Sequence, residues 1–211
     1  MPRTMAFGIL ALALAAPLAA QAPRLRVSAE GVAQFVRESS PTAEEEQAGT
    51  WSGAQVRVDK GRLSGTVRSL FGPLGGNPLR LDRDARVTSV AVRYAVLPWL
   101  GVGLDAEALR LHADLATSIW RTYGVGASAT TGLGLEGFTV HADVGVSLTS
   151  SVAQASPISR ATRAEAGVRY AVPRLPVTLR FEYRVTTVDF TDAADLRFGG
   201  PVIGVMVALR R

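Results

Sequence analysis

The chain contains no cysteine, and beyond its first twenty residues it has no long hydrophobic run. Without cysteine there is no disulfide framework, no thiolate metal site and no cysteine nucleophile. Charged residues recur every few positions, whereas a membrane-spanning helix needs roughly 18 or more apolar residues. Any residence of this chain in a membrane must therefore be through a closed β-sheet.

The first twenty residues predict a signal peptide. Arg3 supplies a positive charge, residues 5–16 are apolar, and small residues surround the expected cleavage site after Ala20. An uncleaved transmembrane helix is the alternative, but this run is too short and Pro17 interrupts it. We therefore expect residues 1–20 to be removed on export and residues 21–211 to form one domain.

The charge of the mature chain does not indicate a nucleic-acid partner. Of 23 basic residues, removal of Arg3 leaves 22, against 18 acidic residues. The arginines are dispersed singly along the chain and are not gathered in the patch that nucleic acid requires.

The stretch from Phe138 to Leu148 alternates apolar and polar residues with a period of two, which predicts a β-strand with one apolar and one polar face. Its length matches the roughly 9 to 11 residues that a tilted strand needs to cross a bilayer. Nine further segments show the same character, so we predict ten strands, over residues 24–36, 50–58, 62–71, 85–96, 100–110, 119–130, 138–148, 160–172, 177–187 and 202–210.

Long and short connections alternate between these segments. The long ones are residues 37–49, 72–84, 111–118, 149–159 and 188–200, and the short ones are 59–61, 97–99, 131–137 and 173–176. This alternation is typical of an all-β, antiparallel, up-and-down transmembrane barrel with short periplasmic turns and longer external loops. Eight strands are the alternative to ten.

The aromatic residues favour a lipid-facing barrel over a soluble periplasmic ligand-binding barrel, which would show the same alternation with its apolar face inside. Most of them lie near strand ends, where two aromatic girdles would mark the membrane interfaces. The predicted girdles are Phe35, Trp51, Phe71 and Trp120 at the long connections, and Tyr94, Trp99, Phe138 and Tyr170 at the short turns.

Together, the export signal, the hairpin over residues 92–104 and the alternating last strand resemble the bacterial outer-membrane β-barrel proteins, in their small single-chain branch. The resemblance implies a monomer in the cell outer membrane, in contact with its lipid and lipopolysaccharide and inserted by the barrel-assembly machinery. Such proteins usually end on an aromatic residue, whereas this chain ends on Arg210 and Arg211.

The predicted lumen face carries nearly balanced charges. Side chains can almost fill the interior of a small barrel, so we predict a lumen plugged by ion pairs, with a narrow pore as the alternative. Counting from the turn over residues 173–176 places Arg169 opposite Arg180 and Glu165 opposite Arg184. The candidate network consists of Glu30, Arg93, Asp105, Glu107, His141, Asp143, Arg163, Glu165, Arg169, Arg180, Glu182 and Arg184.

An enzymatic role has one possible basis in the sequence, the His-Ala-Asp motif at residues 112–114 and 141–143. In a strand, residues two apart share a face, as a general base and its orienting carboxylate should. An outer-membrane hydrolase, either an omptin-like protease or a lipid A deacylase, is therefore the alternative function. We predict instead a structural or surface-interaction barrel with no catalytic residues, no metal site and no cofactor.

Overall fold

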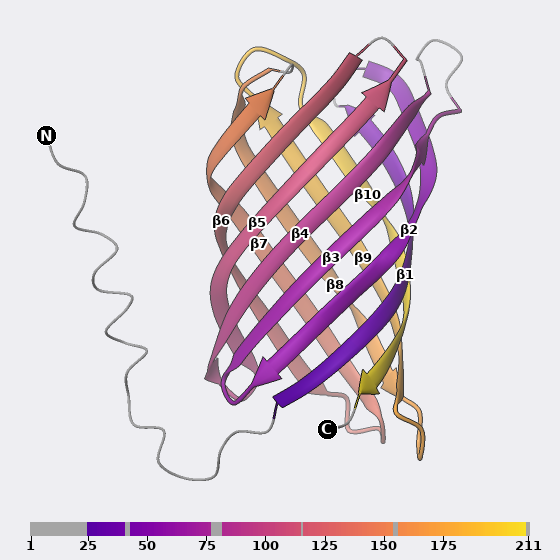
Figure 1. Cartoon of the computed structure of the whole chain (residues 1–211), viewed down its shortest axis with the longest axis vertical. Helices are drawn as coiled ribbons and strands as arrows, with labels where there is room; N and C mark the ends of the chain where they lie inside the picture. Colours follow the sequence, from indigo (N-terminus) through magenta and orange to yellow (C-terminus); the bar gives the residue numbers. More distant parts are fainter. Residues whose placement is uncertain (1–24, 41–42, 77–81, 115, 154–155, 210–211) are drawn as a thin grey trace, which may run out of the picture.

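The computed structural model describes residues 25–40, 43–76, 82–114, 116–153 and 156–209, and the predicted signal peptide lies outside them. The described residues form ten β-strands (Figure 1). These are β1 (Leu25–Ser40), β2 (Ala43–Lys60), β3 (Leu63–Leu74), β4 (Arg83–Leu97), β5 (Leu100–Ala113), β6 (Ala116–Gly132), β7 (Phe138–Ala153), β8 (Ile158–Ala171), β9 (Val177–Phe190) and β10 (Leu196–Leu209). Among the described residues no helix has the length and apolar character to cross a membrane.

Each strand pairs antiparallel with its sequence neighbours, and β1 pairs with β10, so the sheet closes into a barrel. The predicted fold class is confirmed, with ten strands and not eight. β1 begins and β10 ends at the same end of the barrel, which we call the turn end; the opposite end is the loop end (Figure 1). Closure pairs the backbone of both terminal strands, which leaves no open sheet edge.

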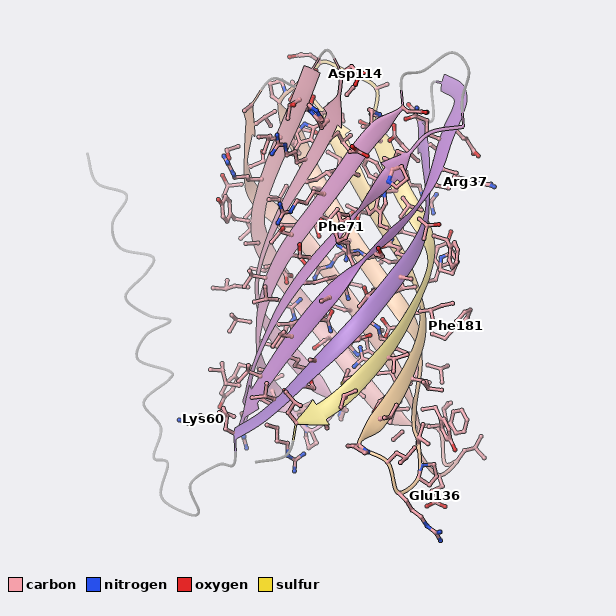
Figure 2. All side chains as sticks on the ribbon, turned by 45° about the vertical axis from the view of Figure 1, so that its right-hand side comes forward. Arg37, Lys60, Phe71, Asp114, Glu136 and Phe181 are labelled. Carbon is pink, nitrogen blue, oxygen red and sulfur yellow. The ribbon has the colours of Figure 1, made fainter. Side chains whose placement is uncertain are left out.

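The alternation of each strand sorts its side chains between the interior and the outer wall. On β4, Val87, Ser89 and Arg93 are buried in the interior, while Val90 and Val92 are 40% and 41% exposed on the outside. Phe181 of β9 likewise projects from the outer wall (Figure 2).

The outer wall carries a broad band of exposed apolar side chains. They include Val67 at 51%, Val144 at 53% and Phe181 at 62%. A soluble barrel would keep such residues inside, because large exposed apolar patches are rare on soluble monomers. An outward apolar band is instead a defining feature of transmembrane barrels, and it contradicts the soluble alternative.

The connections at the loop end are shorter than predicted, because the strands continue beyond the apolar alternation. Arg37 pairs with Ala48 and Glu38 with Gln47, inside the segment predicted as a loop. A strand that has left the membrane meets water on its outer face and needs no apolar alternation, so its sequence looks like that of a loop. The difference in connection length therefore reflects strand extensions beyond the apolar band.

A bulge in β7 changes which residues face inward near the loop end. Tyr123 pairs with Thr149 and Gly124 with Ser147, which leaves Leu148 as the extra residue. Beyond it the parity reverses, and Val152 packs against the buried apolar cluster. At the turn end, Gly61 has a φ of 62°, as the predicted tight hairpin between β2 and β3 requires.

Candidate functional site in the barrel interior

The buried side chains of the interior form two layers, a charged layer toward the turn end and an apolar layer toward the loop end. Several strands contribute to both. On β3, Arg68 is followed on the same face by Leu70, and on β5, Glu107 is followed by Leu109. The layers are thus stacked along the barrel axis, with the boundary at a similar position on these strands.

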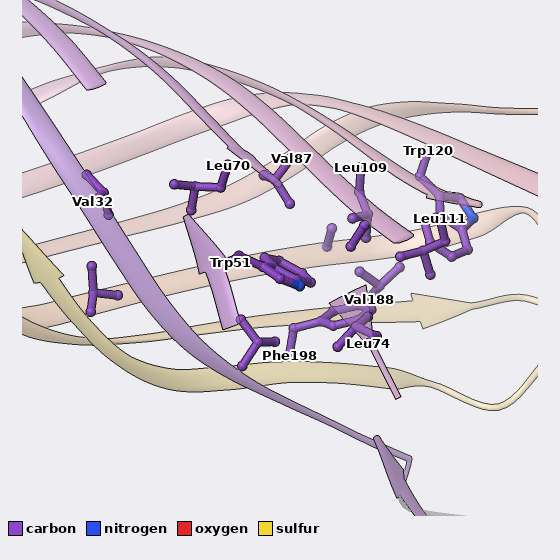
Figure 3. Close-up of a cluster of buried hydrophobic side chains, with 14 of the residues drawn as sticks. Val32, Trp51, Leu70, Leu74, Val87, Leu109, Leu111, Trp120, Val188 and Phe198 are labelled. Atoms are coloured by element: carbon purple, nitrogen blue, oxygen red, sulfur yellow. The ribbon is translucent and has the colours of Figure 1, made fainter. Parts of the chain in front are cut away.

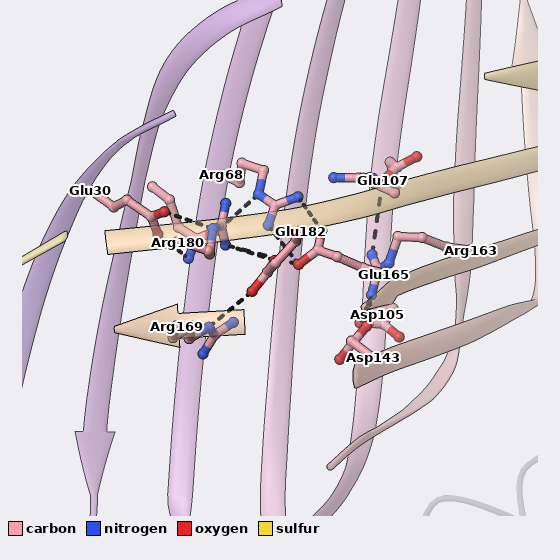
Figure 4. Close-up of polar contacts among 12 residues, drawn as sticks. Glu30, Arg68, Asp105, Glu107, Asp143, Arg163, Glu165, Arg169, Arg180 and Glu182 are labelled. Carbon is pink, nitrogen blue, oxygen red and sulfur yellow. Dashed lines mark hydrogen bonds and ion pairs between the residues drawn. The ribbon is translucent and has the colours of Figure 1, made fainter. Parts of the chain in front are cut away.

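Arg180 of β9 lies at the centre of the charged layer, with 2% of its surface exposed (Figure 4). Its Nε is 2.8 Å from Glu30 Oε1, and its Nη1 is 3.6 Å from Glu182 Oε2 and 3.9 Å from Glu165 Oε1. Neither Arg180 Nε nor Glu30 Oε1 has a hydrogen-bond partner, because the N–H is not aligned with the oxygen. Arg180 therefore interacts with three carboxylates mainly through electrostatic attraction, and less through directed hydrogen bonds.

Arg68 connects β3 to the far wall of the barrel. Its Nη1 and Nη2 donate to the two oxygens of Glu165 on β8, at 2.9 and 3.3 Å. Its Nε donates to Gln55 Oε1 at 2.8 Å, and Gln55 Nε2 in turn donates to Glu30 Oε2 at 3.1 Å. The bidentate pair fixes both the distance and the orientation of two opposite walls.

A second group of charges lies beside the first. Arg93 Nη2 is 2.8 Å from Asp105 and 3.1 Å from Asp143, and Arg163 Nη2 is 3.2 Å and 2.8 Å from the same two carboxylates. Two arginines thus share two aspartates. Glycine makes room for them: a Cβ at Gly126 would overlap Asp105 Oδ2 and lie 2.5 Å from Arg93 Nη2.

The remaining network residues complete the charge balance. Arg184 Nη2 donates to Glu107 Oε2 at 2.5 Å, and Arg169 Nε donates to Glu182 Oε1 at 2.9 Å. All the charged residues predicted for the network take part in its ion pairs, and Arg68 joins them. Six arginines (68, 93, 163, 169, 180, 184) therefore face six carboxylates (30, 105, 107, 143, 165, 182).

His141, also predicted for this network, is buried, and its Nδ1 shares a hydrogen bond of 3.1 Å with Thr130 Oγ1. One ligand atom each from His141, Glu165 and Glu182 lie within 4.8 Å of one another, a grouping that the sequence does not predict. Arg68 and Arg169 already bind these two carboxylates, each at 2.9 Å. A metal ion would have to displace the arginines, so the residues fit an ion-pair network better than a metal site.

The apolar layer lies in the loop-end half of the barrel, where its side chains form one cluster (Figure 3). Leu74 and Val202 have no exposed surface, and Leu70 has 1%. The ring centroid of Trp51 is 6.1 Å from that of Phe198, within the range of favourable aromatic pairs. The other buried members are Val32, Val36, Ala85, Val87, Leu109, Leu111, Trp120, Ile158, Ala161 and Val188.

Beyond the apolar layer, a polar contact and a cavity form the mouth at the loop end. Arg83 donates from Nη2 to Glu38 at 2.6 Å and also binds Gln47. A cavity of about 380 Å³ lies next to Arg83, with Leu111 and Trp120 of the apolar layer in its wall. The cavity lies on the loop-end side of the apolar layer, and its mostly apolar lining resembles that of small-molecule sites.

Two of the eight residues predicted for the aromatic girdles are wrong. Trp51 and Trp120 are only 4% and 7% exposed and belong to the interior apolar layer, not to the membrane interface. The strand alternation itself could have shown that Trp51 faces inward. Trp51 is six residues from the inward-facing Arg57 on β2, and residues an even number apart share a face. The other residues stand on the outer wall: Phe35, Phe71, Tyr94 and Trp99 are 38% to 61% exposed, and the half-buried rings of Phe138 and Tyr170 are 4.5 Å apart.

The His-Ala-Asp motifs do not form catalytic pairs in the described structure. Asp143 is bound by Arg93 and Arg163, and the His141 ring is bound to Thr130. His112 instead lies exposed on β5, where its Nδ1 contacts Thr117 Oγ1 at 2.7 Å. Within the described residues, neither histidine forms the hydrogen bond to a carboxylate that a general base and its orienting group require.

No protein-family model matches the sequence, and no curated protein matches it either. Among solved structures the chain is similar to Neisserial surface protein A (NspA), at 17% identity over 86% of this chain and 96% of that one, with a TM-score of 0.47. It is also similar to LpxR from Salmonella typhimurium, at 11% identity over 86% and 99% of the two chains and a TM-score of 0.36. The translocator domain of the autotransporter NalP from Neisseria meningitidis has 12% identity over 94% and 92%, with a TM-score of 0.36.

At these identities the likeness concerns the fold alone. What decides the class is the closed antiparallel sheet itself, with strands of 12 to 18 residues, an apolar outer wall and a polar layer inside. The chain has the outer-membrane β-barrel fold. In this barrel the inward-facing residues form a packed interior of two chemically distinct layers.

Proposed function

We propose that the protein is an integral barrel of the bacterial outer membrane with a closed lumen, and that its role is structural or one of surface interaction. The apolar outer wall supports the membrane placement. The packed interior supports a function that does not depend on the passage of solutes.

The observation that carries this proposal is the near-complete burial of inward side chains in both layers. Arg180 and Glu182 of the charged layer are 2% and 1% exposed, and Leu74 and Val202 of the apolar layer are not exposed. A continuous water column would expose such residues. The buried charges can remain in this interior because every network carboxylate is near at least one guanidinium group.

Two small cavities lie within the charged layer. One cavity of about 40 Å³ is bordered by Asp105, Glu107 and Arg163, and another of about 70 Å³ by Arg68, His141 and Glu165. Each could hold a few water molecules bound to charged groups. These spaces account for local hydration of the ion pairs, and they do not amount to a size-selective pore.

No geometry in the described residues favours the rival reading as a hydrolase. Catalysis by a His-Asp pair needs the carboxylate to orient the imidazole. In this barrel Asp143 instead forms ion pairs with Arg163 and Arg93, at 2.8 and 3.1 Å.

Solute flux through reconstituted vesicles tests the proposal. Vesicles that contain the refolded barrel should admit a small sugar no faster than protein-free vesicles, because both layers obstruct its path. A general porin in the same lipid is the positive control. The amount of inserted barrel is given by the protein that stays with the vesicles until detergent releases it. Sugar uptake that rises with the amount of inserted barrel would contradict a closed lumen.

A further inference from the structure

Three arginines project from the outer wall near the loop end, on the adjacent strands β4, β5 and β6. Arg86, Arg110 and Arg121 are all exposed, and we call them the outer-wall arginine cluster. They share the outward parity of Val90 on β4 and Leu104 on β5, which are 40% and 54% exposed. The cluster therefore sits on the surface that faces the surroundings of the barrel and has no part in the interior network.

The strand register brings the three arginines together. Arg86 is directly opposite Arg110 in the β4–β5 pair. In the β5–β6 pair, Arg110 is opposite Ile119 and Ala108 is opposite Arg121, so Arg110 and Arg121 are diagonal neighbours. Directly opposed side chains stand ~5 Å apart and diagonal ones roughly 7–8 Å, and opposed like charges are destabilising.

No carboxylate in the described part of the chain is in ion-pair contact with the cluster. None of its three guanidinium groups forms an ion pair there, although Arg37, elsewhere on the outer wall, lies 3.3 Å from Glu46. Asp84 is two residues from Arg86 on the same face and diagonal to Arg110, but in the described structure it forms no ion pair with either arginine. The three positive charges are thus available for an anion from outside the chain.

Aromatic neighbours indicate the depth of the cluster in the membrane. Phe71 is the register partner of Arg86 on β3, and Tyr123 lies two residues from Arg121 toward the turn end. Both rings are on the outer wall, at 61% and 47% exposure. Aromatic rings on a barrel mark the boundary of the apolar band. Arg86 is level with Phe71 and Arg121 lies just beyond Tyr123, so the cluster stands at the level of the lipid headgroups.

We propose that the outer-wall arginine cluster binds the phosphate of a phosphorylated glycolipid in the leaflet around the loop end. Guanidinium groups bind phosphate oxygens in bidentate fashion, and three of them on one face can surround a single headgroup. Below the cluster, Leu104 and Ala106 of β5 face outward and can contact the acyl chains of the same lipid. This second contact commits the site to a lipid and not to free phosphate.

Native mass spectrometry of the refolded full chain in detergent, titrated with bisphosphorylated lipid A, tests this inference. The variant with Arg86→Gln, Arg110→Gln and Arg121→Gln should bind at least about tenfold more weakly, since each arginine near an anionic headgroup contributes roughly a fivefold factor. Arg197→Gln is the matched control, because this exposed arginine on β10 lies opposite Ser39 and Thr187, and its diagonal neighbour Arg37 is already paired with Glu46. It should leave the affinity unchanged.

Two further arms use the unmodified protein, so the test does not depend on the folding of the triple variant. Lipid A without its phosphates should bind as weakly as lipid A binds to the variant, and inorganic phosphate should compete only poorly. Equal binding of the dephosphorylated lipid, or by the triple variant, would overturn the inference. Displacement of the lipid by equimolar phosphate would overturn its commitment to a lipid.

The inference rests on the proposed outer-membrane placement, and the two can fail separately. Insertion of the barrel into vesicles that lack lipid A tests the membrane placement independently of lipid A binding by the cluster. A barrel that inserts but does not distinguish the two forms of lipid A would overturn only the binding site.

Discussion

At the residue scale, Arg180 shows how strongly the buried charges depend on one another. Glu30, Glu165 and Glu182 all lie within 3.9 Å of its guanidinium group, and Glu182 also binds Arg169. Replacement of a whole buried ion pair by apolar residues is often tolerated, whereas loss of one partner leaves an uncompensated charge. The network therefore behaves as a unit, and single substitutions test it more severely than paired ones.

Glu182→Ala should destabilise the barrel strongly, because it removes a carboxylate from both Arg169 and Arg180. In a dry site the expected loss is about 3–5 kcal/mol in the free energy of unfolding. Unfolding by urea in lipid vesicles, followed by tryptophan fluorescence, measures this change.

Asp59→Ala is the matched control for that substitution. Asp59 is also an inward carboxylate, 2.8 Å from Arg57, but it lies near the turn end with 34% of its side chain exposed. A pair that water reaches should contribute at most about 1 kcal/mol. If the two substitutions cost the same, the charged layer is hydrated and the ion pairs do not plug it.

The network was predictable within a hairpin but not across the lumen. Counting from the turn between β8 and β9 correctly places Arg169 opposite Arg180 and Glu165 opposite Arg184. Yet Glu165 binds Arg68, 97 residues away, and Arg184 binds Glu107, 77 residues away. Such contacts depend on how far the strands are staggered when the barrel closes, and local sequence does not contain this information.

At the element scale, the period of two predicts the strands and the direction of their side chains well. Residue type alone gives wrong positions for some aromatic side chains. The position of Trp51 and Trp120 near strand ends predicts a place in the girdle, but their parity along the strands turns both side chains inward. Strand ends were also misjudged where polar residues continue the pairing, as in Arg37 with Ala48. The alternation of apolar and polar residues ends where the outer wall is no longer in contact with lipid. The backbone pairing between strands continues beyond that point.

The face assignment of β7 leads to a prediction about the lipid surface. Val144 faces outward near the middle of the strand at 53% exposure, and Leu148 does so at the bulge nearer the loop end, at 71%. An arginine at the midplane of a barrel costs about 2–4 kcal/mol, and near the interface about 0–1 kcal/mol. Val144→Arg should therefore lower the yield of folding into vesicles far more than Leu148→Arg.

Gel mobility of the folded barrel without heating gives that yield directly. If both variants fold as well as the unmodified chain, this wall does not meet the apolar core of the membrane. If Leu148→Arg is the more damaging, the midplane lies closer to the loop end than the apolar band indicates.

At the scale of the whole molecule, ten strands enclose an interior that side chains can fill, as expected for barrels of this size. The predicted ion pairs occupy only part of it. The sequence does not predict the apolar layer around Trp51, Leu74 and Phe198, because Leu74 and Phe198 fall in segments 72–84 and 188–200, which the alternation assigns to loops. Our account of the closed lumen therefore depends on both layers.

Conductance of the refolded barrel in a planar bilayer tests the closed lumen most directly. The account predicts no stepwise current from the unmodified protein, and measurable steps from a variant that opens both layers, Glu182→Ala combined with Trp51→Ala. Insertion is verified independently by recovery of folded protein from the bilayer lipid. Stable current steps from the unmodified barrel, proportional to voltage, would contradict the account and replace the closed lumen with a narrow pore.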